Sequence, residues 1–265
     1  MEFNPDKKAN FSVIVTGSSS GNGRAIAKRL ARSGAQIICS DLDPVARADG
    51  YEDDLSIPTH EVISNAGGRA VFQRCDVSNL SDFQKLFLEA EHAFGSVDAL
   101  VNNAGVFTGL ATIFDEDPIN FDRAISVNLK GVWNGCKTAA LFFRDRGKPG
   151  KIINIASVGG LVGIGSEPGY CATKGAVINM TRAIALDCAP YHIAVNAIAP
   201  GFIVTGMVRE FMDQPAVLET MREATPWPRF GAPSDVAGAC AYLCSDDAEW
   251  VTGSVLTVDG GFTAK

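Results

Sequence analysis

Short runs of apolar, β-branched residues alternate with longer segments of helical periodicity along most of the chain. The runs predict strands at residues 11–16, 36–40, 70–74, 99–101, 151–155, 193–198 and 254–258. The segments between them predict helices at residues 24–33, 57–66, 79–94, 118–145, 168–189 and 233–244. Strands that alternate with helices imply a parallel sheet. We therefore expect an α/β fold, a doubly wound parallel sheet of about seven strands with helices on both faces.

Composition and net charge narrow the classes of molecule that this protein is expected to bind. The 265 residues carry a net charge of −7, which argues against a nucleic acid or an anionic membrane as partner. No apolar run reaches the roughly 18 residues of a transmembrane helix, and the N-terminus lacks the apolar core of a signal peptide. The seven cysteines show no C-x-x-C pair and no histidine at ligand spacing. This pattern predicts reduced thiols, no metal site and a cytoplasmic protein.

A turn rich in glycine and serine directly follows the first predicted strand and opens a helix. It reads Thr16-Gly17-Ser18-Ser19-Ser20-Gly21-Asn22-Gly23, with the spacing G-x-x-x-G-x-G rather than G-x-G-x-x-G. Glycines in such a turn let backbone N–H groups approach a pyrophosphate at the helix N-terminus. The context therefore predicts a dinucleotide site. The expected cofactor contacts in the turn are Gly17, Ser19, Ser20, Gly21, Asn22 and Gly23.

The end of the second predicted strand indicates which dinucleotide is bound. Asp41 lies there, eighteen residues after Gly23. A carboxylate at this place accepts hydrogen bonds from the adenosine ribose hydroxyls and repels a 2′-phosphate. No Arg or Lys lies at 18–20 or directly after Asp41, and Arg47 is embedded in acidic sequence. The sequence therefore favours NAD over NADP.

Tyr170 and Lys174 stand four residues apart, so both lie on one face of a predicted helix. An adjacent cation favours the ionised form of a phenol, whose pKa is near 10 in water. Such a phenol can exchange a proton with an alcohol or a carbonyl oxygen, and Ser157, at the end of a predicted strand, can hold the same oxygen. By itself the Y-x-x-x-K spacing is typical of surface residues on any helix. The nucleotide motif is what favours the catalytic interpretation.

Together these motifs resemble the short-chain dehydrogenase/reductase family over about residues 10–262, which implies a Rossmann-type fold in which residues 1–265 form one dinucleotide-binding and catalytic domain. The implied catalytic residues are Asn128, Ser157, Tyr170 and Lys174. Beyond the turn and Asp41, the implied cofactor contacts are Asp76, Val77, Asn103, Ala104, Gly105, Tyr170, Lys174, Pro200, Gly201, Ile203 and Thr205.

By this resemblance, hydride passes between NAD(H) and the carbinol carbon of a secondary alcohol or ketone. Tyr170 would exchange the hydroxyl proton as general acid/base, and Ser157 would orient the oxygen. Lys174 would lower the pKa of the phenol and bind the nicotinamide ribose. Asn128 would hold a water that links Lys174 to solvent. The family also implies a homo-oligomer, with a tetramer favoured.

Three features leave alternatives open. Asn22 stands where the family usually carries isoleucine, and its amide would bond the cofactor or the substrate, or face water. The acidic segment 43–56 is longer than the family commonly shows, and it is either a solvated loop or an insertion near the adenosine end of the cofactor. Residues 206–227 follow a Pro-Gly turn with apolar residues at roughly helical spacing, and they form either core or a mobile substrate lid.

The substrate is the least determined part of the prediction. The expected pocket residues, 106–108, 158–164 and the lid, are mainly apolar, with Arg209 and Arg222 as the nearby cations. An uncharged secondary alcohol or ketone is therefore the preferred small-molecule substrate. One alternative is a 3-oxoacyl thioester reductase, which Asp41 and the negative net charge disfavour. An alternative of another class is a non-catalytic NAD-binding sensor, which would be expected to lack one of the catalytic residues.

Overall fold

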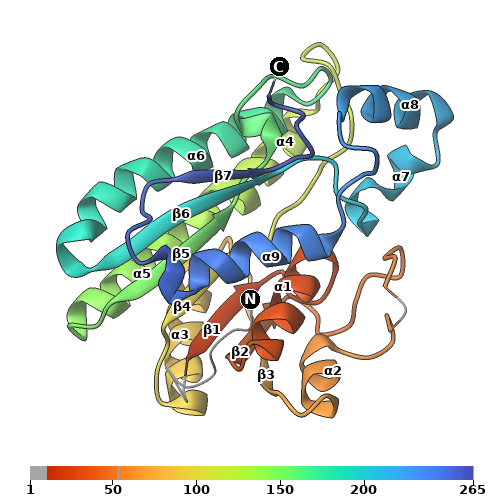
Figure 1. Ribbon diagram of the computed structural model, residues 1–265. Helices are drawn as coiled ribbons and strands as arrows, with labels where there is room; N and C mark the ends of the chain where they lie inside the picture. Colours follow the sequence, from red (N-terminus) through yellow and green to blue (C-terminus); the bar gives the residue numbers. More distant parts are fainter. Residues whose placement is uncertain (1–10, 53, 265) are drawn as a thin grey trace.

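The computed structural model describes residues 11–52 and 54–264, so residues 1–10, 53 and 265 of the expected domain lie outside the described part. Its centre is a seven-stranded sheet in the order β3-β2-β1-β4-β5-β6-β7 (Figure 1). All paired strands run parallel, and β1 pairs with β2 on one side and β4 on the other. The strands are β1 (Ser12–Thr16), β2 (Gln36–Asp41), β3 (Arg69–Arg74), β4 (Ala99–Asn102), β5 (Gly150–Ile155), β6 (Ile193–Pro200) and β7 (Val255–Val258). The expected doubly wound parallel sheet is confirmed.

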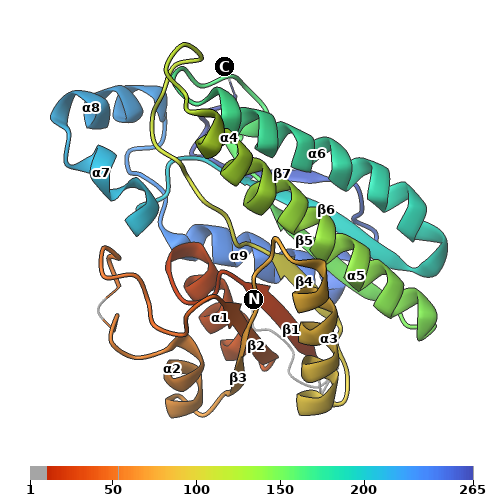
Figure 2. The same ribbon diagram turned by 180° about the vertical axis from the view of Figure 1, so that it is seen from behind.

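Helices cover both faces of this sheet. On one face α1 packs against α9, and α2 lies beside β3 (Figure 1). On the other face lie α3, α5 and α6, as the view from behind shows (Figure 2). The helices are α1 (Gly21–Arg32), α2 (Thr59–Asn65), α3 (Leu80–Phe94), α4 (Pro118–Ala124), α5 (Val132–Asp145), α6 (Pro168–Cys188), α7 (Arg209–Met212), α8 (Pro215–Ala224) and α9 (Pro233–Cys244).

The central strands divide their side chains between two apolar clusters, one on each face of the sheet. Ile14 and Ile38 belong to the cluster that includes α3, α5 and α6, whereas Val13, Val15 and Ile37 belong to the cluster that includes α1 and α9. Strands buried on both faces explain why the sequence shows continuous apolar runs rather than alternation. Because each such side chain contributes about 1.5–3 kcal/mol by burial, the centre of the sheet is a stable support for the residues at its edge.

Three segments differ from the expected elements. The helix expected over 118–145 consists of α4, a π-helical segment (Ile125–Gly131) and α5. Residues 206–227 contain a short 3₁₀ turn (Gly206–Val208), α7 and α8. Residues 43–52 form neither helix nor strand and precede α2. Across residues 11–52 and 54–264, no helix is long and apolar enough to cross a membrane, and no three His, Cys, Asp or Glu side chains gather in a metal-binding group.

Candidate active site

The expected site residues meet at one edge of the sheet because the carboxyl ends of parallel strands lie together. The glycine turn follows β1, Asp41 ends β2, and Ser157 lies two residues after β5. Residues 103–105 follow β4, and residues 201–205 follow β6. The strand order reverses between β1 and β4, and the crevice outside that switch point is where open α/β sheets bind ligands.

Ser157, Tyr170 and Lys174 are held by β5 and by the first turns of α6. The Ser157 hydroxyl accepts a hydrogen bond from the Gly159 N–H at 3.1 Å, and Ser157 is close enough to the Tyr170 phenol to lower its pKa. Lys174, one helical turn after Tyr170, is 4% exposed, and its Nζ donates to the Ile155 carbonyl at 2.9 Å. The three side chains therefore form one cluster at the end of β5, in which Ser157 and Lys174 are buried and Tyr170 is partly buried.

Burial dominates the electrostatics of this cluster. It raises the pKa of Tyr170 to about 12, although Ser157 acts in the opposite direction. It also lowers the pKa of Lys174 to about 8. The Lys174 Nζ lies 5.6 Å from the centroid of the phenol ring and donates one of its hydrogen bonds to the Ile155 carbonyl. In the protein alone the pKa of the phenol is thus raised, with desolvation as the largest cause, and the predicted lowering of this pKa by Lys174 stays a prediction.

Glu167 is a functional candidate that the sequence analysis missed. It is the N-cap residue of α6, makes no side-chain cap hydrogen bond, and precedes Tyr170 by three residues. Burial raises the pKa of its carboxyl to about 7, and its charge raises the pKa of Tyr170 further. The available signal was an acid placed directly before Pro168, where an α-helix begins.

Asn128 lies fully buried in the π-helical segment. Its Oδ1 accepts from the Val106 N–H at 2.8 Å, and its Nδ2 donates to the Val106 carbonyl at 2.9 Å. The side chain thus fixes the chain just after β4, beside Gly105. Segments of π-helix are rare and are frequent at functional sites. The predicted role of Asn128 in holding a water stays a prediction.

The glycine turn forms a cradle that side chains would fill. A Cβ on Gly23 would lie 2.0 Å from the Gly17 carbonyl oxygen, and one on Gly17 would lie 2.8 Å from the Ala104 Cα. Asn103 closes the turn from the other side, since its Nδ2 donates to the carbonyls of Thr16 and Gly17 at 2.9 and 3.1 Å. The turn, Asn103 and Ala104 are thus brought together as predicted, and their close packing fits a dinucleotide pyrophosphate at the start of α1.

The remaining predicted cofactor residues line the two sides of this cradle. Asp41 accepts from the Ser19 N–H at 3.1 Å, and burial raises the pKa of its carboxyl. Asp76 accepts from both the N–H and the hydroxyl of Ser78, and Val77 is buried. Opposite them, a Cβ on Gly21 would lie 3.3 Å from the Thr205 methyl carbon. Pro200 ends β6, Gly201 packs on Asp259, and Ile203 is buried.

Asn22 sits in this cradle with its Oδ1 buried and without a hydrogen-bond partner among the described residues. An amide oxygen in that state costs about 1–3 kcal/mol relative to a satisfied one. The Asn22 residue as a whole is partly exposed, so the predicted alternatives for this amide, a bond to a ligand or contact with water, both stay predictions. An unsatisfied acceptor beside the turn is what a site for a ligand with N–H or O–H donors requires.

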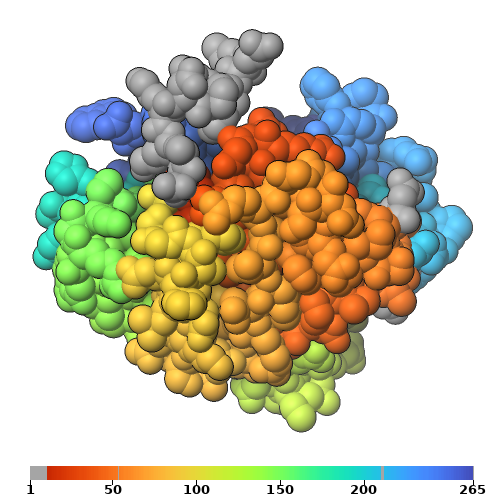
Figure 3. All heavy atoms as spheres, turned by 90° about the horizontal axis from the view of Figure 1, so that it is seen from below, coloured from red at the N-terminus to blue at the C-terminus, as the bar shows by residue number. Residues whose placement is uncertain are grey.

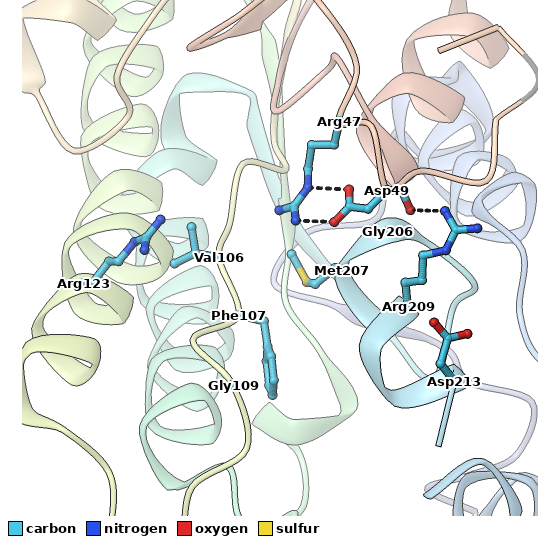
Figure 4. Close-up of a pocket in the computed structure, with 10 residues that line it drawn as sticks. All are labelled: Arg47, Asp49, Val106, Phe107, Gly109, Arg123, Gly206, Met207, Arg209 and Asp213. Atoms are coloured by element: carbon cyan, nitrogen blue, oxygen red, sulfur yellow. Dashed lines mark hydrogen bonds and ion pairs between the residues drawn. The ribbon is translucent and has the colours of Figure 1, made fainter. Parts of the chain in front are cut away.

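A cavity of about 360 Å³ opens between the chain after β4, α4, residues 47–49 and the lid segment (Figure 4). Arg47 pairs with Asp49 at 2.6 Å, and Phe107 packs edge-on against Tyr170 with ring centroids 5.3 Å apart. The lining residues are Arg47, Asp49, Val106, Phe107, Gly109, Arg123, Gly206, Met207, Arg209 and Asp213. The cavity therefore adjoins the catalytic cluster through one aromatic contact.

This lining corrects the expectation of a mainly apolar pocket. Arg47 and Arg123, which the sequence analysis did not place there, join Arg209 in the lining. Arg222 instead pairs with Glu219 on the exposed surface of α8. The expected contribution of residues 158–164 is absent from this cavity. The lid contributes as expected, through Gly206, Met207, Arg209 and Asp213. The contribution of Arg47 and Asp49 could not be read from the sequence, because these residues and α7 meet only in the folded chain.

Comparison with known proteins places this geometry in a family. Residues 17–263 match the family described as enoyl-(acyl carrier protein) reductase. The chain is 37% identical to 2-(S)-hydroxypropyl-CoM dehydrogenase 3 of Xanthobacter autotrophicus, over 96% of this chain and 97% of that one. It is 39% identical to 3beta-hydroxysteroid dehydrogenase 1 of Eggerthella lenta, over 95% and 93%.

A solved structure gives the same result. A putative 2-deoxy-d-gluconate 3-dehydrogenase from Agrobacterium tumefaciens, crystallised with bound NADP, superposes with a TM-score of 0.87 and 32% identity. The match covers 99% of this chain and 100% of that one. With the glycine turn, the Ser157–Tyr170–Lys174 cluster and the strand order in agreement, this chain is a member of the short-chain dehydrogenase/reductase family.

Proposed function

We propose that this oxidoreductase transfers a hydride between NAD(H) and a secondary alcohol or ketone, with Tyr170 as general acid/base. The observation that carries the proposal is the cluster in which Ser157 lies beside the Tyr170 phenol and the buried Lys174 lies one helical turn away. The cluster stands at the same sheet edge as the glycine turn. A substrate oxygen between Ser157 and Tyr170 would lie within reach of the proton that it must lose or gain.

The raised pKa of Tyr170 implies that the cofactor binds before the phenol can act as a base in the proposed mechanism. A bound nicotinamide dinucleotide supplies the hydride acceptor and, in its oxidised form, a positive charge near the phenol. Because burial, with smaller contributions from Glu167 and Cys171, raises the pKa of Tyr170 to about 12, we expect the phenol to act as a base near neutral pH only after that charge has arrived. Lys174 adds its own ammonium and would bond the nicotinamide ribose, while Ser157 orients the substrate oxygen.

Asp41 supports NAD as the cofactor. Its carboxylate stands at the end of β2 and accepts from the Ser19 N–H of the turn, where it would meet the adenosine ribose and repel a 2′-phosphate. The Agrobacterium relative carries NADP. We therefore propose NAD for this chain from its own carboxylate and not from the relatives.

Two alternative functions have less support. A 3-oxoacyl thioester reductase agrees with the name of the matching family, but a net charge of −7 disfavours an acidic carrier protein as partner. A non-catalytic NAD-binding sensor is disfavoured because Ser157, Tyr170 and Lys174 are all present and clustered. The relatives described above are dehydrogenases by name, which favours oxidation or reduction at a carbinol carbon.

The assembly and the lid complete the proposal. We propose that residues 206–227 act as a substrate lid, since Gly206, Met207 and Arg209 line the cavity next to Tyr170 through Phe107. All seven cysteines are free, and all but Cys171 are buried, which suits a reducing cytoplasm. We also propose that the chain forms a single catalytic domain, assembles as a homotetramer and acts on a small-molecule substrate. Light scattering after gel filtration measures the oligomeric state directly.

The test is the initial rate of NADH formation, at fixed NAD, across cyclic alcohols, aliphatic secondary alcohols, polyols, sugars, hydroxysteroids and 3-hydroxyacyl thioesters. We expect one class of secondary alcohols to be oxidised well above the others, and NADP to replace NAD poorly. Preferential oxidation of the thioesters would favour the reductase alternative. No oxidation in the panel, with NADH still bound, would contradict the proposed substrate class.

A further inference from the structure

Residues 43–52 together with Asp54, here called the strap, lie across the glycine turn. Among these described residues, three hydrogen bonds join the strap to the turn. The Ser19 hydroxyl donates to the Asp43 carbonyl at 2.6 Å, and the Arg47 N–H donates to the Ser20 hydroxyl at 2.8 Å. The Gly21 N–H donates to the Glu52 carboxylate at 2.5 Å. The strap is therefore fastened to the serines and the glycine at the start of α1.

The strap also contacts the lid on the opposite side of the cavity. Arg209 donates to the Asp49 and Gly50 carbonyls at 2.9 and 3.1 Å, and its guanidinium lies 4.4 Å from the Tyr51 ring centroid. A Cβ on Gly206 would lie 2.9 Å from the Asp49 carboxylate. In the space-filling view the orange surface of this region lies beside the blue surface of the lid (Figure 3). The strap thus contacts both the glycine turn and the lid.

The Glu52 contact involves a donor that a dinucleotide needs. Gly21 is the first residue of α1, and the free N–H groups and the dipole of a helix N-terminus favour a negative charge. The pyrophosphate of a dinucleotide bound at this turn would use the same N–H. A carboxylate and a phosphate oxygen cannot both accept there, because like charges at hydrogen-bonding distance repel strongly.

The two ends of the strap are anchored differently from its middle. Asp54 pairs with Arg24 at 2.9 Å and with Lys28 at 3.2 Å, and Arg24 is 1% exposed. At the other end, Asp43 lies two residues after the last residue of β2. The part between them is held to the turn by single polar bonds. It can therefore leave the turn while both ends stay in place.

We propose that Glu52 is a built-in competitor of the cofactor: its carboxylate fills the pyrophosphate position of the glycine turn, and the strap must release it before a dinucleotide binds. The inference rests on the proposed dinucleotide cofactor. It adds that part of the binding free energy is spent on displacing one carboxylate of the chain itself. Glu52 is thus a determinant of cofactor affinity.

The test is the affinity of Glu52→Gln for NADH, measured by ligand fluorescence without substrate. Gln keeps the length of the side chain and removes its charge, so we expect NADH to bind about tenfold more tightly, as about 1.4 kcal/mol of relieved competition would give. Inorganic pyrophosphate should gain by a similar factor, whereas adenosine, which has no phosphate, should bind both proteins equally. Glu61→Gln changes the net charge equally on α2, outside the strap, and should leave all three affinities unchanged.

Each outcome decides one question. Unchanged or weaker NADH binding by Glu52→Gln overturns the role of the strap. An equal gain for adenosine also overturns it, because the substitution would then have loosened the region in general. If neither protein binds NADH or NADPH, the proposed function fails instead.

Discussion

The two halves of the candidate site are built in different ways. In the catalytic half, Lys174 bonds the Ile155 carbonyl of β5, Ser157 accepts from the Gly159 N–H of the turn that follows β5, and Tyr170 stands on the 21-residue helix α6. In the nucleotide half, the glycine turn is covered by a strap without helix or strand, and the Glu52 carboxylate accepts a hydrogen bond from the turn. The comparison teaches that the chain preorganises its candidate proton-transfer groups with regular elements, whereas the access of a nucleotide to the glycine turn depends on a segment held by polar contacts.

Tyr170→Phe sharpens the comparison most. Removing the general acid/base should lower turnover by about 10²–10⁴-fold, whereas NADH affinity should change by less than about twofold because the turn is untouched. Steady-state rates and NADH titration measure both. Tyr242→Phe, on the exposed side of α9, is the control and should leave both values unchanged. A large loss of NADH affinity in Tyr170→Phe would break the division into two halves.

Glu167→Gln tests how much the ionised Glu167 carboxylate lowers the free energy of unfolding in the catalytic half. The pKa of Glu167 is about 7 in the folded protein against an ordinary 4.5, so the folded state holds the proton more tightly. The stabilising effect of the neutral form is complete below about pH 4.5 and is lost as the pH rises through about 7. We expect Glu167→Gln to raise the free energy of unfolding by up to about 3 kcal/mol at pH 8 and by nearly nothing at pH 4.

Urea unfolding at the two pH values measures this difference. Glu249→Gln, at an exposed position, is the matched control and should show the same stability difference at both pH values. An equal effect of Glu167→Gln at pH 4 and pH 8 would mean that the carboxyl is not held neutral by burial.

Asp41→Asn probes the nucleotide half. The amide keeps an acceptor for the Ser19 N–H but removes the charge that repels a 2′-phosphate, so the ratio of kcat/KM for NADP to that for NAD should rise about tenfold, or about 1.4 kcal/mol. Initial rates with each cofactor measure it. Asp43→Asn, an exposed neighbour, should change the ratio far less. A wild-type protein that already prefers NADP would contradict the role given to Asp41.

Asn22→Ile has the smallest expected effect. It removes a buried amide oxygen without a partner among the described residues, so the free energy of unfolding should rise by about 1 kcal/mol. If Asn22 bonds the cofactor, NADH affinity should fall in the same variant. Urea unfolding and NADH titration measure the two effects, with Asn65→Ile on the exposed end of α2 as control. Lower stability would show that the oxygen is satisfied in solution.

The sequence predicted those parts that depend on local pattern. β-branched runs are visible because strands buried on both faces tolerate few polar residues, and Ser157, Tyr170 and Lys174 meet because strand ends and helix starts share one sheet edge. The pKa of Tyr170 was not predictable, since an i,i+4 spacing gives proximity but not desolvation. The Arg209 bonds to Asp49 and Gly50 join residues about 160 positions apart, and no local pattern indicates such a contact.

The π-helical segment has a consequence for how the length of this chain can change. An α-helix turns by about 100° per residue, and a π-helical turn closes its hydrogen bonds over one residue more than an α-helical turn. The wider turns of Ile125–Gly131 accommodate one residue more than an α-helix would need, so deleting one residue there would let the run become ordinary α-helix while α4 and α5 keep the faces that they now present. Phe143, now fully buried, would stay in the core, and Trp133, now exposed, would stay at the surface. A one-residue deletion inside α5 itself would instead turn every later residue of that helix by about 100°.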